Sequence, residues 1–215
     1  ELRAPFLNSF GSTETGLPPL SGHLLDVGAQ LTDLSKRMNS GCELRLVDPA
    51  GRDVAADAVG EAWVRGPTLF SGYWTRHGLD RSSFRDGWYA MGDLFRRSPG
   101  GGFQFVGRSK YLIKSGGENI YPAEIERVLL DDARIEDAVV VRRPDPVWGE
   151  VPVGFVVPRS PDLREQDVMD LCLHRLARYK RPKEVRFVAA AELPRNATGK
   201  IVRETLERIA AGRSA

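Results

Sequence analysis

Very few residues in this chain could build a disulfide framework or a metal cluster. The chain has 215 residues, of which two are cysteines, Cys42 and Cys172, and three are histidines. The wide separation of the cysteines fits neither a disulfide framework nor a paired-cysteine zinc site. The histidines show no metal-ligand spacing. We therefore expect a reducing compartment, with the cytoplasm as the default location.

The chain also lacks long apolar runs and a dominant charge. No apolar stretch approaches the roughly 20 residues of a membrane span, and no secretory signal opens the sequence. The net charge is only +2, so composition gives no support for nucleic acid as a partner. An apolar share of 41% is typical of a globular protein with a real core. The opening stretch, ELRAPFLNSF, is typical of an internal strand, so we expect a fragment of a longer protein.

Short alternating segments dominate the first half of the chain. Alternation of apolar and polar residues, bounded by turn residues, predicts strands at 42–48, 60–66, 87–94 and 102–107. Strands this short favour a small, strongly bent sheet or a distorted barrel.

The pattern changes after Gly107. Pro122 can occupy the first turn of a helix, where its missing N–H costs little. Further helices are predicted over 163–177 and 201–211, and strands at 138–142, 151–157 and 185–188. We therefore expect a fold of the α+β class, in which a β-rich domain (1–107) is followed by a hinge (108–114). A small, mobile α+β domain with a three-stranded sheet (115–215) completes it.

Three polar stretches could carry chemistry. In NSFGSTETG (8–16), Glu14 could hold a hard cation through oxygen, and Thr13 could contact phosphate. In GWYAMGD (87–93), Asp93 could accept hydrogen bonds from a ribose diol. In PRNATGK (194–200), Lys200 could reach a developing negative charge. Each stretch alone is more typical of a plain turn or loop, and none has the spacing of a Walker loop.

Taken in order, and together with GRSKYLIKSGGENIYPAEIE (107–126), the three stretches resemble the adenylate-forming (AMP-binding) superfamily in its acyl- and aryl-CoA synthetase branch. The resemblance runs from about Asn8 to Arg203. It implies the C-terminal part of a ligase that joins a carboxylic acid to ATP, releases pyrophosphate and passes the acyl group to CoA. Residues 17–40 match the family poorly. The phosphate loop and most of the acyl pocket are absent, so we expect the fragment alone to be inactive.

The resemblance assigns most of the ATP/AMP contacts to the first half of the chain. Phe10 matches an aromatic position that stacks on adenine, where tyrosine is commoner, and Phe105 is expected near the same base. Thr13 matches a phosphate contact and Glu14 a ligand of Mg2+. Asp93 matches the carboxylate that binds the ribose, and Arg108 is expected where the ribose meets the phosphates. Lys200 matches the catalytic lysine, which bridges the acid's carboxylate and the α-phosphate.

Other roles concern the thioester step. Lys110 matches the hinge position, and Tyr111 replaces the acidic residue that is frequent after it. The resemblance places Lys114 in the active site of the second conformation, and Gly116 and Gly117 along the channel for the thiol arm. The candidates for contact with CoA are Trp148, Tyr179 and Arg181.

Two other functions stay open at this point. The thiol acceptor could be a carrier protein, which would make the protein an acyl-AMP ligase or a carrier-loading domain. The chain could also be a non-catalytic module that binds nucleotide or a partner. Trp148 could be simple packing and Tyr179 a capping aromatic, and nothing in the sequence names the acid.

Overall fold

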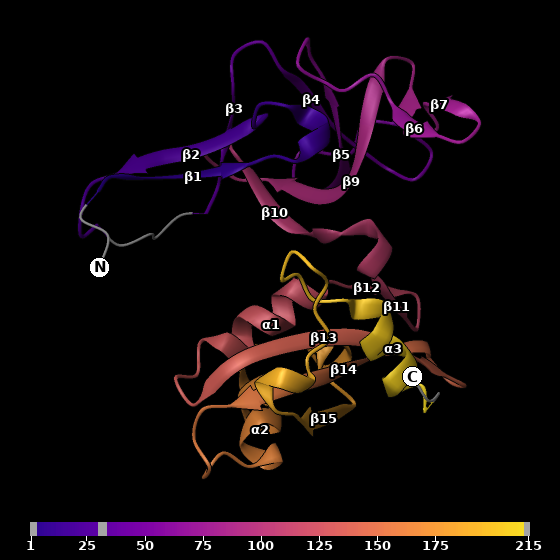
Figure 1. Ribbon diagram of the computed structural model, residues 1–215. Helices are drawn as coiled ribbons and strands as arrows, with labels where there is room; N and C mark the ends of the chain where they lie inside the picture. Colours follow the sequence, from indigo (N-terminus) through magenta and orange to yellow (C-terminus); the bar gives the residue numbers. More distant parts are fainter. Residues whose placement is uncertain (1–3, 30–33, 213–215) are drawn as a thin grey trace. The chain divides into compact units, whose positions relative to one another are not determined.

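The computed structural model describes residues 4–29 and 34–212, and the chain forms two compact units (Figure 1). The first unit ends at Ser109 and the second begins at Lys110. This division lies within the segment 108–114 that we expect to hold a hinge. The hinge itself stays a prediction.

The first unit begins with a three-stranded antiparallel sheet. Its strands follow the chain in the order β1 (Phe6–Phe10), β2 (Leu20–Leu25) and β3 (Arg37–Met38). A short 3-10 turn, η1 (Thr13–Thr15), lies between β1 and β2. Residues 17–40, which the sequence patterns did not place, therefore supply two of the three strands, and residues 30–33 lie outside the described part.

A five-stranded antiparallel sheet follows. It contains β4 (Glu43–Val47), β5 (Val59–Arg65), β9 (Trp88–Arg97) and β10 (Phe103–Arg108) in the order β10-β9-β5-β4, while β8 (Phe84–Arg85) pairs with β9. A bridge between Lys36 and Phe103 links this sheet to the first one. Both sheets supply side chains to one core, which contains Leu20, Leu44, Leu46, Ala62, Val64, Tyr89, Met91, Phe95 and Phe103. The strongly bent, β-rich first half predicted from alternation is confirmed. A separate hairpin is formed by β6 (Tyr73–Thr75) and β7 (Gly78–Asp80).

The second unit is an α+β domain, as predicted, but its sheet has five strands rather than three. The long hairpin of β13 (Ile135–Asp145) and β14 (Gly149–Pro158) forms its centre, and β15 (Glu184–Phe187) joins β14 in parallel. The two unexpected strands are β11 (Ile113–Ser115) and β12 (Glu118–Ile120). The stretch IKSGGENI is therefore a tight hairpin. Gly116 and Gly117 form its turn with φ of +57° and +87°, the positive values that a two-residue type I′ turn requires.

Helices cover both faces of this second sheet (Figure 1). The side chains of Ile125 in α1 (Pro122–Leu130) and Val168 in α2 (Glu165–Arg175) share a core with Val140 of β13. The neighbouring Val139 points the other way, into a core with Leu206 of α3 (Arg203–Ala210). Because successive strand residues face opposite sides of a sheet, the apolar run in β13 is buried on both faces.

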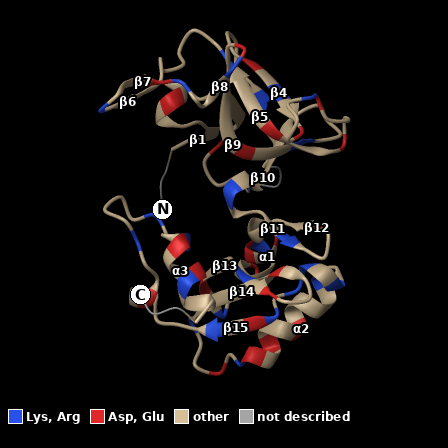
Figure 2. Cartoon of the chain, turned by 90° about the vertical axis from the view of Figure 1, so that its right-hand side faces the viewer, with Lys and Arg blue, Asp and Glu red and all other residues tan. Residues whose placement is uncertain are grey.

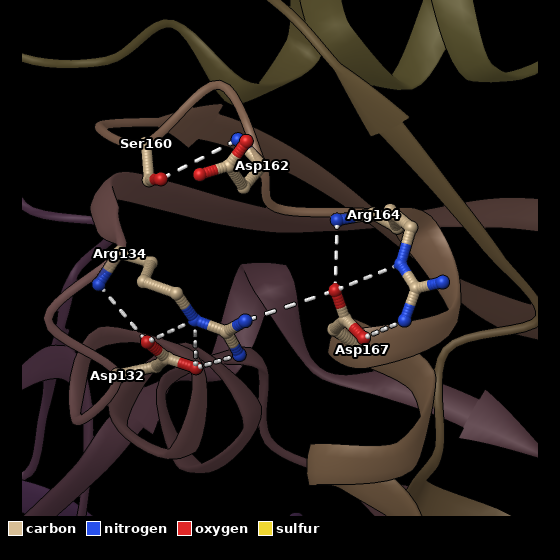
Figure 3. A network of polar contacts seen from close by, with 6 residues as sticks. All are labelled: Asp132, Arg134, Ser160, Asp162, Arg164 and Asp167. Atoms are coloured by element: carbon tan, nitrogen blue, oxygen red, sulfur yellow. Dashed lines mark hydrogen bonds and ion pairs between the residues drawn. The ribbon is translucent and has the colours of Figure 1, made fainter.

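Charged side chains tie the start of α2 to the turn before β13, as Figure 3 shows. Asp167 accepts a hydrogen bond from the Arg164 backbone N–H at 3.0 Å, which satisfies a donor at the helix start. The Arg134 guanidinium lies 3.7 Å from Asp167 and also contacts Asp132 at 2.8 Å. Charges of both signs continue along α2 and α3 (Figure 2). Among the described residues, the structure contains no helix long and apolar enough to cross a membrane.

Candidate functional site

Three phenylalanine rings meet at the end of β1 in the first unit. Phe10 packs edge-on against Phe95 with ring centroids 4.8 Å apart, and its ring lies 5.6 Å from Phe105 with a tilt of 32°. Phe95 is completely buried, whereas Phe105 is 39% exposed. The two residues that we expect near adenine therefore lie together, on a buried aromatic support and with part of Phe105 open to a flat ligand.

Asp93 and Arg108 form a bidentate ion pair at the β9–β10 edge of the same unit. The two residues are opposite each other in the strand register. Arg108 Nε donates to Asp93 Oδ1 at 2.7 Å and Nη2 donates to Oδ2 at 3.1 Å. The Asp93 side chain is 3% exposed and that of Arg108 is 46% exposed. A buried carboxylate is thus fixed in direction by a guanidinium that still faces solvent.

The Glu14 carboxylate is held from the side of the β6–β7 hairpin. The Tyr73 hydroxyl donates to Glu14 Oε1 at 2.9 Å. Burial by itself would raise the pKa of Glu14, but hydrogen bonding outweighs this effect, with the Glu14 backbone N–H and the Tyr73 hydroxyl among the donors. The charge of Arg108 acts in the same direction, so the pKa of Glu14 lies below its ordinary value. Glu14 is therefore ionised at neutral pH.

The surroundings of Glu14 fit a magnesium ion that arrives with a nucleotide. Within residues 4–29 and 34–212, no three or more His, Cys, Asp or Glu side chains are grouped as a metal cage. Mg2+ commonly takes only one or two protein carboxylates and completes its coordination with phosphate oxygens and water. One ionised carboxylate, with Thr13 exposed beside it, suits that mode of binding and does not suit a resident metal.

In the second unit, Lys200 is presented by a well-ordered loop. The Asn196 side-chain oxygen accepts hydrogen bonds from the backbone N–H groups of Thr198 and Lys200, each at 3.0 Å. A β-bridge between Arg195 and Ile201 closes the loop. Lys200 is exposed, and its ammonium group has no partner in the part of the chain that the structure describes. The loop is therefore rigid at its base while the cation is free to reach a ligand.

The hairpin turn at Gly116 packs closely against Trp148. The Gly116 N–H donates to the Trp148 carbonyl at 2.8 Å, and a Cβ at Gly116 would lie 2.7 Å from the indole ring. The Lys183 ammonium lies 5.7 Å from the ring centroid, and Trp148 is 49% exposed. By contrast, a Cβ at Gly117 would meet nothing within 4 Å. Gly116 is therefore needed for packing as well as for the turn, whereas Gly117 is needed only for its backbone conformation.

Tyr179 and Arg181 lie in and just after the 3-10 turn η3 (Arg178–Lys180), which contacts β12. Tyr179 is 42% exposed, and the Lys180 ammonium lies 5.6 Å from its ring centroid. Arg181 Nε donates to the Leu176 carbonyl at the end of α2, at 3.1 Å. Arg181 thus already stabilises a helix terminus, which is a structural role in addition to any contact with a ligand.

Lys110 and Lys114 both lie in the second unit. Lys110 is near the first turn of α3, and Lys114 is near β14. The Lys110 ammonium is 3.1 Å from Glu204 Oε1 and 4.5 Å from the Tyr111 ring centroid. Contact with Tyr111 and the ion pair with Glu204 raise the pKa of Lys110. The Lys114 backbone N–H donates to Glu150 at 2.8 Å. The expected hinge lysine is therefore tied to α3, and Lys114 belongs to β11 rather than to a linker.

The Lys200 loop and the surface formed by Gly116 and Trp148 lie at opposite ends of the β13–β14 ladder. The Lys200 loop is tied to Asp137 by Arg195 at 2.9 Å, whereas Gly149, beside Trp148, pairs with Asp145. Asp145 is eight positions after Asp137 in β13, which corresponds to about 26 Å at 3.3 Å per residue. The domain thus presents a cation at one end and an aromatic, glycine-containing surface at the other.

Sequence reasoning missed two residues of the first unit. Tyr73 contacts Glu14, and Glu61 contacts the backbone N–H of Gly92, next to Asp93. Glu61 occupies an outward position of an alternating strand, where a solvated side chain is the ordinary expectation. The sequence marked Tyr73 only by its aromatic side chain, and the hairpin that brings it to Glu14 is seen only in the structure.

Comparison with known proteins gives consistent results over both units. Residues 1–74 match the family model described as AMP-binding enzyme, and residues 124–200 match that of the AMP-binding enzyme C-terminal domain. Indoleacetate–CoA ligase of Aromatoleum aromaticum is 40% identical over 209 residues, 96% of this chain and 40% of the relative. 2-Succinylbenzoate–CoA ligase of Bacillus cereus is 38% identical over 213 residues, 97% of this chain and 42% of the relative.

A solved structure supports the same assignment. The o-succinylbenzoate CoA synthetase of Bacillus subtilis, in complex with its acyl-adenylate intermediate, is 33% identical with a TM-score of 0.82, over 94% of this chain and 41% of that one. Another structure of that enzyme holds ATP and a magnesium ion. The chain spans about 40% of the length of the curated relatives it matches. The chain belongs to the adenylate-forming AMP-binding enzyme family, in its acyl- and aryl-CoA synthetase branch, and includes the family's C-terminal domain.

Proposed function

We propose that this chain is the C-terminal part of a ligase that activates a carboxylic acid with ATP and transfers the acyl group to CoA. The observation that carries the proposal is the grouping in the first unit of an aromatic pair, Phe10 and Phe105, with the ion pair of Asp93 and Arg108. An apolar platform beside a buried carboxylate suits a nucleoside, which has a flat base and a diol.

Each group in the first unit has a distinct task in this proposal. The exposed edge of Phe105 and the ring of Phe10 receive adenine by stacking. Asp93 accepts hydrogen bonds from the ribose hydroxyls, while Arg108 holds its carboxylate in place and presents its half-exposed guanidinium to phosphate. A polar contact to the ribose gives selectivity, because a nucleotide without the hydroxyl makes one hydrogen bond fewer to the buried Asp93 carboxylate.

The phosphate end of the site would be formed by Thr13, Glu14 and Lys200. The ionised Glu14 carboxylate suits a magnesium ion that comes with ATP. When bound, that ion offsets the negative charge of the phosphates. Lys200 supplies a second positive charge where the acid's carboxylate approaches the α-phosphate, and this charge stabilises the negative charge that builds there. Lys200 belongs to the second unit, so this proposal divides the adenylation step between residues of both units.

We infer that the same domain serves the thioester step from its other end. Gly116, Gly117 and Trp148 form the surface that would receive the thiol arm of CoA, with Lys114 nearby on β11 and Tyr179 as an aromatic neighbour. The separation of this surface from Lys200 supports a rotation about Lys110 between the two half-reactions. Arg181 would contact a CoA phosphate only through the N–H groups that do not bond to α2.

Aromatic carboxylic acids are the first substrate class to test. The names of both curated relatives contain an aromatic acid, indoleacetate in one and 2-succinylbenzoate in the other. Both cysteines of the chain are free thiols, and the reducing compartment stays a prediction. The cytoplasmic location stays a prediction.

The test uses the full-length protein that carries this chain, with ATP, Mg2+ and a panel of aromatic and aliphatic acids. We expect pyrophosphate release that depends on an acid, and formation of a CoA thioester. Replacement of Asp93 with alanine should weaken ATP binding. Absence of acid-dependent pyrophosphate release across the panel would contradict the proposed reaction. Transfer to a pantetheinylated carrier protein but not to free CoA would reassign the acceptor.

A further inference from the structure

The strand that carries Asp93 is irregular at the residue before it. In the register of β5 with β9, Glu61 faces Leu94 and Trp63 faces Ala90, so Ala62 alone is opposite three residues of β9. The middle one of these three, Gly92, has φ of +73°. Extra residues in one strand bend it and leave backbone groups without cross-strand partners. This bulge therefore needs hydrogen-bond partners from elsewhere.

Side chains supply those partners on both sides of Gly92. The Gly92 N–H donates to Glu61 Oε1 at 3.0 Å, and the Gly92 carbonyl accepts from the Ser109 hydroxyl at 3.1 Å. The second carboxylate oxygen of Glu61 accepts from the indole N–H of Trp63 at 3.3 Å. Unpaired backbone groups away from water are costly, so these contacts keep the bulge in one conformation.

The conformation of the bulge determines where the Asp93 carboxylate points. Asp93 directly follows Gly92, is almost completely buried, and has both of its carboxylate oxygens in contact with Arg108. The positive φ at Gly92 bends the strand locally without ending it. A small change there displaces the carboxylate relative to the phenylalanine rings on β1 and β10. Because catalytic and binding groups tolerate only small misplacements, the support of this bulge has functional weight.

We propose that Glu61 is a positioning residue for nucleotide binding. Its carboxylate substitutes for the missing cross-strand partner of Gly92 and so holds Asp93 in the direction that receives the ribose. Glu61 does not contact the nucleotide in this account. The inference rests on the proposed role of Asp93 and adds to it the residue on which that role depends.

The experiment compares Glu61→Ala and Glu61→Gln in the full-length protein, with Asp93→Ala as a reference. Glu43→Ala is the matched control, because Glu43 lies on neighbouring β4 and pairs with Arg65 in an exposed position. The measured quantities are the dissociation constants for ATP and for 2′-deoxy-ATP and 3′-deoxy-ATP. We expect Glu61→Ala to weaken ATP binding about tenfold, which is the effect of leaving one part-buried N–H without its acceptor. Binding of the deoxynucleotide that lacks the contacted hydroxyl should change little.

Glu61→Gln tests the hydrogen bond itself. The amide oxygen can still accept from the Gly92 N–H, so we expect ATP binding within about threefold of the unaltered protein. Glu43→Ala should leave binding of all three nucleotides unchanged. A general structural defect would weaken binding of every nucleotide alike, whereas a positioning role removes only the preference for the hydroxyl.

Hydrogen–deuterium exchange supplies a readout that does not depend on nucleotide binding. The peptide that contains Gly92 should exchange faster in Glu61→Ala and in Ser109→Ala, and at an unchanged rate in Glu43→Ala. If Asp93→Ala abolishes the preference for ATP over the deoxynucleotide while Glu61→Ala preserves that preference, the positioning role of Glu61 is wrong. If Asp93→Ala itself preserves the preference, the proposed ribose contact of Asp93 fails. Faster exchange at Gly92 in Glu61→Ala would then still support the role of Glu61 in the bulge.

Discussion

Replacing the two turn glycines one at a time separates a structural role from a role in thiol transfer. The Cβ of an alanine at position 117 would meet nothing within 4 Å. Its cost in folding free energy therefore comes only from the backbone, which has a φ of +87° at Gly117. Non-glycine residues in this region cost about 1–2 kcal/mol. Alanine at Gly116 carries the same kind of cost at a φ of +57°. Its Cβ would in addition lie 2.7 Å from the ring of Trp148.

The extra cost at Gly116 follows from that close contact. Overpacking of this kind costs about 1–3 kcal/mol, and the half-exposed Trp148 ring can relieve part of it by turning outward. We therefore expect Gly116→Ala to lower the free energy of unfolding by about 2–4 kcal/mol and Gly117→Ala by about 1–2 kcal/mol. Urea denaturation of the two full-length variants measures the difference directly. Equal losses for the two variants would contradict the packing account of Gly116.

The same two variants test the proposed thiol channel. If the glycines serve only the hairpin, both variants should transfer an acyl group from supplied acyl-adenylate to CoA at the unaltered rate below their melting temperatures. If the glycines line the channel, even Gly117→Ala should slow transfer at least tenfold, although it meets no atom within its own unit. A normal transfer rate for Gly117→Ala would refute the channel.

Three further predictions concern separate contacts. Asp167→Ala should lower the free energy of unfolding by about 1 kcal/mol in urea titration, because it removes a helix-start acceptor, whereas the exposed Asp170→Ala should change it little. Burial raises the pKa of the Cys172 thiol to about 11, so Cys172 should resist alkylation at pH 8 in the folded protein and react after unfolding; labelling of Cys172 at the rate of a free thiol would contradict this. Because the folded state then keeps a proton that the unfolded state loses, this thiol's contribution to stability is present at neutral pH and falls by about 1.4 kcal/mol per unit from pH 9 to 11. Tyr73→Phe removes the hydrogen bond to Glu14 and should raise the Mg2+ concentration for half-maximal pyrophosphate release about threefold to tenfold; an unchanged Mg2+ dependence would exclude this role of Tyr73.

Alternation predicted the longer strands of the first unit well because each has one face on a core. In β5, for example, Gly60, Ala62 and Val64 are buried and the residues between them are partly exposed. The hairpin of β11 and β12 could not be predicted in this way. Its strands have three residues each, which is too short for a period to show, and its two glycines suggested a ligand loop before they suggested a turn.

The candidate site was predicted unevenly for a similar reason. Motif resemblance indicated Phe10, Asp93 and Arg108, and the structure places Asp93 against Arg108 and Phe10 near the same strand pair. The residues that hold them were hidden, because Glu61 occupies an outward strand position and its importance depends on a bulge in a different strand. Residues 17–40 match the family's motifs poorly, and the pairing of β2 with β1 and with β3 depends on contacts between distant residues that no local signal carries.

The central claim is that one small domain serves two chemical steps from opposite ends. The most direct test measures both half-reactions in Lys200→Ala and Lys114→Ala of the full-length protein. We expect Lys200→Ala to slow acid-dependent pyrophosphate release severely and to leave thioester formation from supplied acyl-adenylate intact, with the reverse pattern for Lys114→Ala. If each variant instead slows both half-reactions equally, the two-ended use of the domain is contradicted.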